Sequence, residues 1–193
     1  MIAERIDLRA LVARPWKNGA GVTREIARGG PGGDAFDWRI SVAEVERDAP
    51  FSQFPGVDRC IVLLRGAGMR LRARDGSVDH RLIEPYVPLR FAADVALDAT
   101  LVGGASSDFN VMTRRGAFRS DVRCCFGATH IAGGDVTLLV SCEGEWRIDD
   151  DHVIGALHAL LWREPLGSVD VRPAAGTGPA TLLCVRLCHD RCP

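Results

Sequence analysis

Short apolar segments, interrupted every few residues by Gly, Pro, Asp or Ser, run along most of the chain. Residues 60–64 are apolar on both faces, which predicts a strand in the middle of a sheet. Residues 70–74 alternate charged and apolar side chains, and Asp75-Gly76 follows them as a tight turn. Residues 78–83 then return as a second strand, so this region predicts a β-hairpin.

A second alternating segment predicts a strand with one buried face. Its apolar positions fall on one side of an extended chain, and they are Phe36, Trp38, Ile40 and Val42. Helical periodicity is confined to the extreme N-terminus and to short connectors. The pattern as a whole therefore predicts an all-β protein.

An internal duplication is visible at low similarity. Residues 61–71 resemble residues 137–147, and each segment is followed by a charged hairpin and a later closing strand. A strand, a glycine turn, a hairpin and a return strand is the layout of small jelly-roll barrels of the cupin type. We therefore expect a bicupin, with one jelly-roll-type barrel over residues 1–115 and a second over residues 116–193, together forming one compact unit. Chance similarity between β-rich segments is the alternative.

Composition narrows the classes of partner. The 193 residues carry a formal net charge of -1, so no basic field favours nucleic acid or an anionic membrane surface. No apolar run approaches the roughly 18 residues of a transmembrane helix, and the N-terminal residues lack the apolar region of a signal peptide. We expect a cytoplasmic protein with neither nucleic acid nor membrane as a partner.

Seven cysteines are an odd number, and in a cytoplasmic protein the default state is the reduced thiol. Cys124 and Cys125 are adjacent, while Cys184, Cys188 and Cys192 recur every four residues. The segment before Cys184 has the pattern of a strand, on which Cys184 and Cys188 would lie about 13 Å apart at about 3.3 Å per residue. That separation is too large for one metal ion, so a zinc site is disfavoured.

Catalytic machinery is not apparent in the sequence. Most enzymatic cupins bind a metal through an H-x-H pair, a carboxylate and a later histidine. Residues 51–59, where those ligands would fall, contain no histidine, and the matching place in the second half offers only His130. No G-x-S-x-G motif or glycine-rich phosphate loop is present either. We expect no metal, no cofactor and no catalytic nucleophile.

Residues 15–26 are the most informative segment, because a turn here carries a tryptophan, a lysine and an asparagine into a strand with alternating charges. Arg24 shares a face with apolar neighbours, whereas Thr23 and Glu25 point the other way. A partly buried Arg24 must pair or meet an anion. A purely structural ion pair of Arg24 with Glu25 or Asp108 is the alternative.

Two further segments add to this polar cluster. Arg39 follows Trp38, and Asp108, Asn110 and Met112 share one face of a strand. Arginine side chains bind carboxylates in a bidentate manner, and tryptophan faces enclose small ligands. The combined pattern favours a pocket for a small, polar and anionic molecule.

These segments, in this order and spacing, resemble the HutD/Ves family of bacterial proteins over roughly residues 5–116. The matching motifs are residues 15–19, 23–26, 38–41, 51–52, 54–59 and 108–114. The resemblance implies a bicupin fold, often dimeric, without an established enzymatic activity. Members encoded beside histidine-utilisation genes are thought to bind an intermediate such as urocanate or formylglutamate and to limit flux. Other members are linked only to stress or cold responses.

Carried over by motif, the resemblance gives the pocket candidates Trp16, Lys17, Asn18, Thr23, Arg24, Glu25, Trp38, Arg39, Asp108 and Asn110. One departure is Ala20, where the family usually has a third glycine. The added methyl group matters only if the backbone there requires a positive φ angle.

The leading hypothesis is a non-catalytic, metal-free protein that binds a small carboxylate, urocanate-like or formylglutamate-like, and regulates histidine catabolism, with a homodimer as the implied assembly. The alternative is a metal-independent isomerase or hydrolase with Glu25 or Asp108 as a general base. In a third hypothesis the polar cluster only stabilises the barrel or supports a protein interaction.

Overall fold

The computed structural model describes residues 2–32, 35–176 and 178–190, and these residues form an all-β protein, as the sequence predicts. The only helix among them is the 3-10 turn η1 (Leu8–Ala10), so the expectation of helix near the N-terminus is met by a single turn. No helix in the described part of the chain is long or apolar enough to cross a membrane.

The chain divides into two compact units. We call Val12–Phe118 the N-terminal unit, and we call the residues up to Leu11 together with those from Arg119 onward the C-terminal unit. The first strand of the chain thus belongs with the second half of the sequence. It does so because its backbone pairs antiparallel with a C-terminal strand, from Glu4 opposite Leu161 onward.

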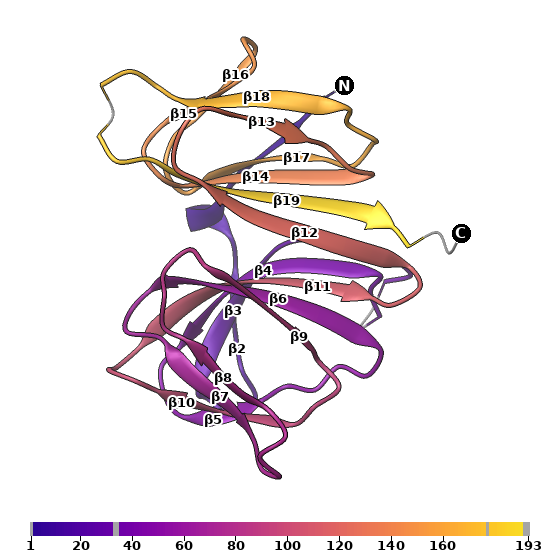
Figure 1. The fold of residues 1–193 in the computed structure, drawn as a ribbon, viewed down its shortest axis with the longest axis vertical. Helices are drawn as coiled ribbons and strands as arrows, with labels where there is room; N and C mark the ends of the chain where they lie inside the picture. Colours follow the sequence, from indigo (N-terminus) through magenta and orange to yellow (C-terminus); the bar gives the residue numbers. More distant parts are fainter. Residues whose placement is uncertain (1, 33–34, 177, 191–193) are drawn as a thin grey trace. The chain divides into compact units, whose positions relative to one another are not determined.

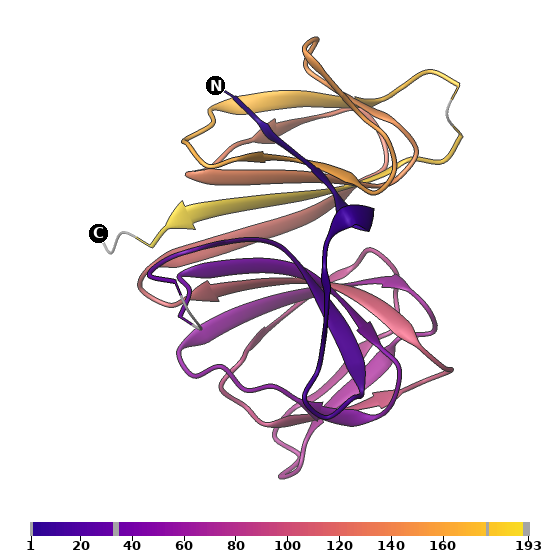
Figure 2. The same cartoon turned by 180° about the vertical axis from the view of Figure 1, so that it is seen from behind.

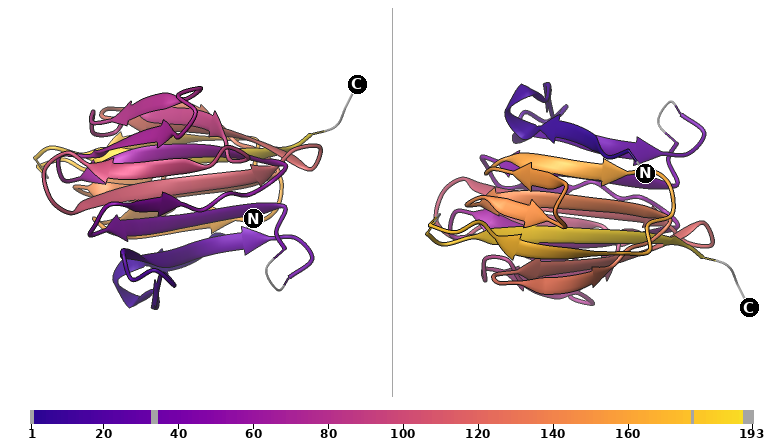
Figure 3. Two further views of the ribbon diagram at one scale, coloured as in Figure 1. Left: turned by 90° about the horizontal axis from the view of Figure 1, so that it is seen from below. Right: turned by 90° about the horizontal axis from the view of Figure 1, so that it is seen from above.

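The N-terminal unit contains two antiparallel sheets (Figure 1). The larger sheet consists, in spatial order, of β2 (Ala13–Pro15), β3 (Gly21–Gly29), β4 (Trp38–Val45), β11 (Ser106–Arg114), β6 (Val57–Arg65) and β9 (Pro88–Ala92). The smaller sheet consists of β5 (Ala49–Phe51), β10 (Leu97–Leu101), β7 (Met69–Ala73) and β8 (Asp79–Leu82). The indigo and violet strands β2 and β3 lie at one edge of the larger sheet (Figure 3).

The C-terminal unit also contains two sheets. The larger consists of β1 (Glu4–Asp7), β17 (His158–Trp162), β14 (Val136–Glu143), β19 (Thr181–His189) and β12 (Phe118–Cys125). The smaller consists of β13 (Thr129–Ala132), β18 (Ser168–Pro173), β15 (Trp146–Ile148) and β16 (His152–Ile154). The indigo strand β1 is visible at the edge of the larger sheet from behind (Figure 2).

Both units repeat the same arrangement of eight consecutive strands. The spatial orders β4-β11-β6-β9 and β5-β10-β7-β8 recur as β12-β19-β14-β17 and β13-β18-β15-β16. This repetition agrees at the level of topology with the duplication expected from the sequence. In neither unit do the described strands close into one hydrogen-bonded barrel, because each unit keeps two separate sheets. The predicted bicupin with two jelly-roll-type barrels is therefore not confirmed.

The local sequence explains several of these strands. β6 lies between two other strands, and residues 60–63 of the predicted apolar run 60–64 are nearly inaccessible to solvent, whereas Leu64 is only partly buried. β7 and β8 form the predicted hairpin, in which Gly76 has a φ of 74° and the Asp75 carboxylate accepts hydrogen bonds from Ser77. Phe36 precedes β4 and packs with Val57 and Met112 in a small cluster of its own.

Each unit has its own apolar core. In the N-terminal unit the buried cluster consists of aliphatic residues together with Met69 and Phe51, from Val45 on β4 to Ala99 on β10. In the C-terminal unit the corresponding cluster includes the fully buried Trp146 and the nearly buried Trp162. The cluster of the N-terminal unit is bordered at one end by polar side chains, and these form the candidate site.

Candidate functional site

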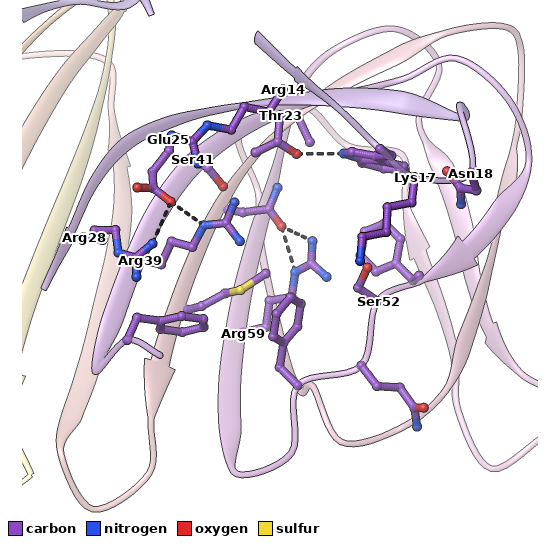
Figure 4. A pocket seen from close by; sticks show the side chains of 18 of the residues that line it. Arg14, Lys17, Asn18, Thr23, Glu25, Arg28, Arg39, Ser41, Ser52 and Arg59 are labelled. Atoms are coloured by element: carbon purple, nitrogen blue, oxygen red, sulfur yellow. Dashed lines mark hydrogen bonds and ion pairs between the residues drawn. The ribbon is translucent and has the colours of Figure 1, made fainter. Parts of the chain in front are cut away.

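A cavity of about 630 Å³ opens in the N-terminal unit (Figure 4). Its walls come from the β2–β3 turn, the adjacent strands β3 and β4, the inner strands β11 and β6, and the segment from the end of β5 to Phe54. Phe36, Phe51, Phe54 and Trp16 contribute aromatic surface, and most of the other lining side chains are polar or charged.

The β2–β3 turn forms the first wall and carries Trp16, Lys17 and Asn18. The Trp16 indole Nε1 donates a hydrogen bond to Thr23 Oγ1 at 2.8 Å, which fixes the ring against β3. Asn18 Oδ1 accepts from the backbone N–H of Ala20 at 3.1 Å. Gly19 has a φ of 65°, whereas Ala20 is not among the residues with positive φ, so the methyl group of Ala20 causes no backbone strain.

The second wall depends on a β-bulge in β3. Thr23 and Glu25 face the cavity by ordinary alternation, and the bulge between Glu25 and Ala27 brings Arg28 back to the same side. Arg28 lies opposite Arg39 of β4. Glu25 Oε2 is 2.9 Å from Arg39 Nε and 3.9 Å from Arg28 Nη1, so one carboxylate holds two guanidinium groups (Figure 4).

Arg59 of β6 and Asn110 of β11 form the inner wall. The Arg59 side chain donates from Nε to Asn110 Oδ1 at 2.7 Å, and its Nη2 donates to the same oxygen. The guanidinium carbon lies 4.0 Å from the centre of the Phe51 ring, which is a cation–π contact. Burial lowers the pKa of Arg59 to about 10, with Asp108 acting in the opposite direction, so the group stays protonated at neutral pH.

Behind Asn110 lies a fully buried carboxyl group. Asp108 Oδ1 accepts a hydrogen bond from Asn110 Nδ2, whereas Asp108 Oδ2 has no hydrogen-bond partner among the described residues. Burial raises the pKa of Asp108 to about 6, and the charge of Arg59 and the Asn110 hydrogen bond only partly offset that rise. Asp108, Asn110 and Arg59 therefore form one chain of contacts that ends at the cavity.

The charge balance of the lining is positive. Glu25 is the one carboxylate among the described residues that line the cavity. The cationic lining residues are Arg14, Lys17, Arg28, Arg39 and Arg59. Such an excess of positive charge in a partly enclosed space favours an anionic ligand.

The structure brings seven of the ten sequence-predicted residues to this cavity, namely Trp16, Lys17, Asn18, Thr23, Glu25, Arg39 and Asn110. The other three lie elsewhere. Arg24 points to the opposite face of β3 and donates from Nη1 to Glu44 Oε1 at 2.8 Å. Trp38 is buried with its ring against Gly29, and Asp108 lies behind Asn110. A binding role for any of these residues stays a prediction.

Sequence reasoning missed several lining residues, among them the cationic Arg14, Arg28 and Arg59. The bulge in β3 hid Arg28, because simple alternation places it on the outer face. Arg59 was detectable, since it alternates with Ile61 and Leu63, two buried positions of the same strand. Residues 51–59 attract attention only as possible metal ligands, and a guanidinium group such as that of Arg59 does not bind metal ions.

The arrangement suits binding better than proton transfer. Glu25 lines the cavity with its Oε2 in ion pairs with two arginines, which favour the ionised form and weaken it as a base, and Asp108 is inaccessible behind an amide. Within the described residues, no group of three or more His, Cys, Asp or Glu side chains is placed to hold a metal ion. The groups presented are guanidinium and amide donors next to aromatic rings, which match a planar carboxylate.

Comparison with known proteins identifies the family and the fold. The HutD family model matches residues 9–176. A conserved protein of unknown function from Pseudomonas aeruginosa PAO1 has a solved structure that is 31% identical, with a TM-score of 0.85 over 97% of this chain and 99% of its own. HutD from Pseudomonas fluorescens SBW25, solved in a formate condition, is 27% identical, with a TM-score of 0.83 over the same shares.

More distant structures show the fold alone. A cupin 2 conserved barrel domain protein from Leptotrichia buccalis is 11% identical, with a TM-score of 0.58 over 96% of this chain and 97% of its own. The all-β architecture is therefore cupin-like.

Proposed function

This chain belongs to the HutD family, and on that premise we propose that its N-terminal unit binds a small carboxylate without a metal and without catalysing a reaction. One observation carries the proposal. Arg59 is only 7% exposed, yet no carboxylate of the described residues lies within ion-pair distance of it. Its guanidinium group faces the cavity with an amide oxygen and an aromatic ring as neighbours.

A buried cation without a paired anion is costly to a folded protein. A carboxylate in the cavity would supply that anion, and Arg39, whose Nε already contacts Glu25, would present its remaining N–H groups from the neighbouring wall. Hydrogen bonds between charged groups contribute about 1.5–3 kcal/mol each. Two of them are enough to select an anion over a neutral molecule of the same shape.

The aromatic lining of the cavity further restricts the chemical class of the proposed ligand. Phe51, Phe54 and Trp16 offer flat apolar surface beside the cationic groups. A planar or unsaturated carboxylate of the urocanate type uses both features, and formylglutamate uses the charge. Membership of the HutD family is consistent with a protein related to histidine utilisation. We propose that occupancy of this cavity by such an intermediate limits histidine catabolism.

Isothermal titration calorimetry with urocanate, formylglutamate and formate at moderate salt tests this function. We expect heat of binding from at least one of the three, and an affinity at least tenfold lower in Arg39→Gln, because a charged donor is lost. Arg24→Gln is the matched control, since Arg24 belongs to the same sheet but contacts Glu44 on the opposite face. It should bind as the wild type does.

Two outcomes contradict this function. One is an absence of heat with all three carboxylates while the protein is folded by circular dichroism. The other is that Arg39→Gln lowers the melting temperature and leaves the affinity unchanged, which is what a purely structural ion-pair cluster predicts.

We also propose that each unit is an opened jelly roll of the cupin type. The repeated eight-strand order and the cupin-like structural relatives support this assignment. The two sheets of each unit would then be the two halves of a barrel that hydrogen bonds do not close.

A further inference from the structure

Two thiols from neighbouring strands meet in the C-terminal unit, outside the cavity. Cys125 is the last residue of β12, and Cys184 lies on β19, the adjacent strand of the same sheet (Figure 1). Their sulfur atoms are 3.7 Å apart and within hydrogen-bonding distance. The residues are 59 positions apart in the sequence, so the fold and not the chain brings them together.

The two thiols have different surroundings. Cys184 is 4% exposed and belongs to the apolar core with Leu139, its partner in register on β14. Cys125 packs against that core but is partly accessible to solvent. The hydrogen bond between the two thiols and the charge of Arg123 both lower the pKa of Cys125, whereas the same hydrogen bond and burial raise the pKa of Cys184. Cys125 is thus the thiol that ionises and meets reagents first.

We propose that Cys125 and Cys184 are a peroxide-oxidation site that forms a reversible disulfide between β12 and β19. In the first step the Cys125 thiolate attacks one oxygen of a hydroperoxide, the O–O bond breaks, and the leaving oxygen takes a proton to give water or an alcohol. Cys125 is then a sulfenic acid. In the second step the Cys184 sulfur attacks the Cys125 sulfur, the S–O bond breaks, and the hydroxyl group leaves with the Cys184 proton as water.

The two steps balance in both atoms and electrons. With hydrogen peroxide, two thiols and one peroxide give one disulfide and two water molecules. The two sulfur atoms together lose two electrons, and the peroxide gains them. A dithiol reductant reverses the reaction by exchange. The site needs nothing from the carboxylate cavity, so its fate is independent of the proposed function.

The neighbouring thiols define the competing products. Cys124 precedes Cys125 on β12, and adjacent side chains of a strand point to opposite faces, so Cys124 is directed away from Cys184. Cys124 and Cys142 are both close enough to influence Cys184 electrostatically. Cys188 lies four residues further along β19, about 13 Å away at the usual strand rise. A disulfide bond between Cys125 or Cys184 and any of these cysteines would be a different product from the one proposed.

Peptide mapping of the full-length protein tests the assignment. The reduced protein is treated with a small excess of hydrogen peroxide, alkylated, digested without reductant and examined by mass spectrometry. We expect a cross-linked peptide pair containing Cys125 and Cys184, which dithiothreitol abolishes. A bridge that joins strands so distant in sequence should also raise the melting temperature by about 5–10 °C.

Variants make the result specific. Cys124→Ser is the matched control and should still form the bridge, whereas Cys125→Ser should form none and should show no rise in melting temperature with peroxide. A Cys124–Cys125 link, a link to Cys142 or Cys188, or full alkylation of Cys125 after peroxide treatment overturns the assignment. The wild-type map alone distinguishes these outcomes, so the test holds even where a variant fails to fold.

Discussion

The two units share eight strands in the same order and differ in what those strands enclose. Each unit also carries one irregularity in the pairing of its two inner strands, between Ser107 and Asp108 in β11 against β6, and between Ser141 and Glu143 in β14 against β19. This common bulge allows the two interiors to be compared position by position. The two units thus have the same backbone arrangement, although the side chains in their interiors differ.

Counting from the bulge, Asp108 corresponds to Leu182 and Asn110 to Cys184. By the same count along the neighbouring strand, Arg59 corresponds to Thr137. The three polar residues that border the cavity in one unit are therefore matched by a leucine, a cysteine and a threonine in the other. The thiol is the one that contacts Cys125.

This difference shows that the fold fixes where a site can be and the side chains decide whether it exists. The N-terminal unit buries a guanidinium and a carboxyl group, an arrangement that costs stability unless a ligand or a proton compensates it. The C-terminal unit fills the same region with apolar side chains, including Trp162 next to Thr137. Exchanging single residues between the two interiors is the direct way to challenge this view.

The largest effect is expected when the acidic residue is moved into the apolar interior. Leu182→Asp places a charge in a fully buried position without a partner, and we expect the free energy of unfolding to fall by about 4 kcal/mol at pH 8. Urea denaturation followed by tryptophan fluorescence measures it. Leu182→Asn is the control of equal size, and the gap between the two variants should widen from pH 5 to pH 8. A loss below about 1 kcal/mol would mean that the two interiors are interchangeable.

A smaller effect, with a defined pH window, is expected at Asp108. The folded pKa of about 6 exceeds the unfolded value of 3.8, so the native state holds its proton to higher pH. The stability associated with the neutral carboxyl is therefore complete below about pH 4 and declines as the pH rises towards 6, by about 3 kcal/mol at most. Asp108→Asn should remove this decline and be the more stable protein at pH 7.5.

Urea titrations at pH 4, 5, 6 and 7.5 follow the difference between the wild type and Asp108→Asn. Asp98→Asn is the control, because Asp98 is a surface carboxylate paired with Arg74. It should leave the pH dependence as in the wild type. A different result is that the free energies of unfolding of Asp108→Asn and the wild type stay parallel through this range. That result would mean that the pKa of Asp108 is not raised in the folded protein and that the surrounding polar groups already compensate its charge.

The smallest effect belongs to the face of β3 that is turned away from the cavity. Arg24 and Glu44 form an ion pair with side chains 30% and 41% exposed, and such pairs contribute less than about 1 kcal/mol. In a double-mutant cycle with Arg24→Gln and Glu44→Gln, the coupling energy should stay below that value. A larger coupling would show that both faces of β3, and not only the inner one, hold polar groups that the fold depends on.

Much of the fold could be predicted because it depends on neighbours in sequence. The β7–β8 hairpin follows from alternation and from the turn at Asp75-Gly76, and the shared face of Thr23 and Glu25 follows from the two-residue period of a strand. These features need no knowledge of which strand pairs with which.

The rest depends on distant pairing and could not be predicted in this way. Glu25 contacts Arg39 and Arg28, and Arg24 contacts Glu44, so the structural pairing expected between Arg24 and Glu25 or Asp108 does not occur. The bulge in β3 and the register of β4 decide these contacts, and neither leaves a signal in local alternation. The Cys125–Cys184 contact escaped detection for the same reason.

The two strands that precede the repeat, β2 and β3, have a consequence for how this protein can diversify. They have no counterpart among the eight strands β12 to β19 of the C-terminal unit. The segment they form nevertheless supplies Trp16, Lys17 and Glu25 to the cavity. Under the proposed function, a short N-terminal hairpin is what distinguishes the carboxylate-binding unit from the other unit, which has the same order of eight strands. The same proposal makes the hairpin the segment in which ligand preference can change without altering the strand order that the two units share.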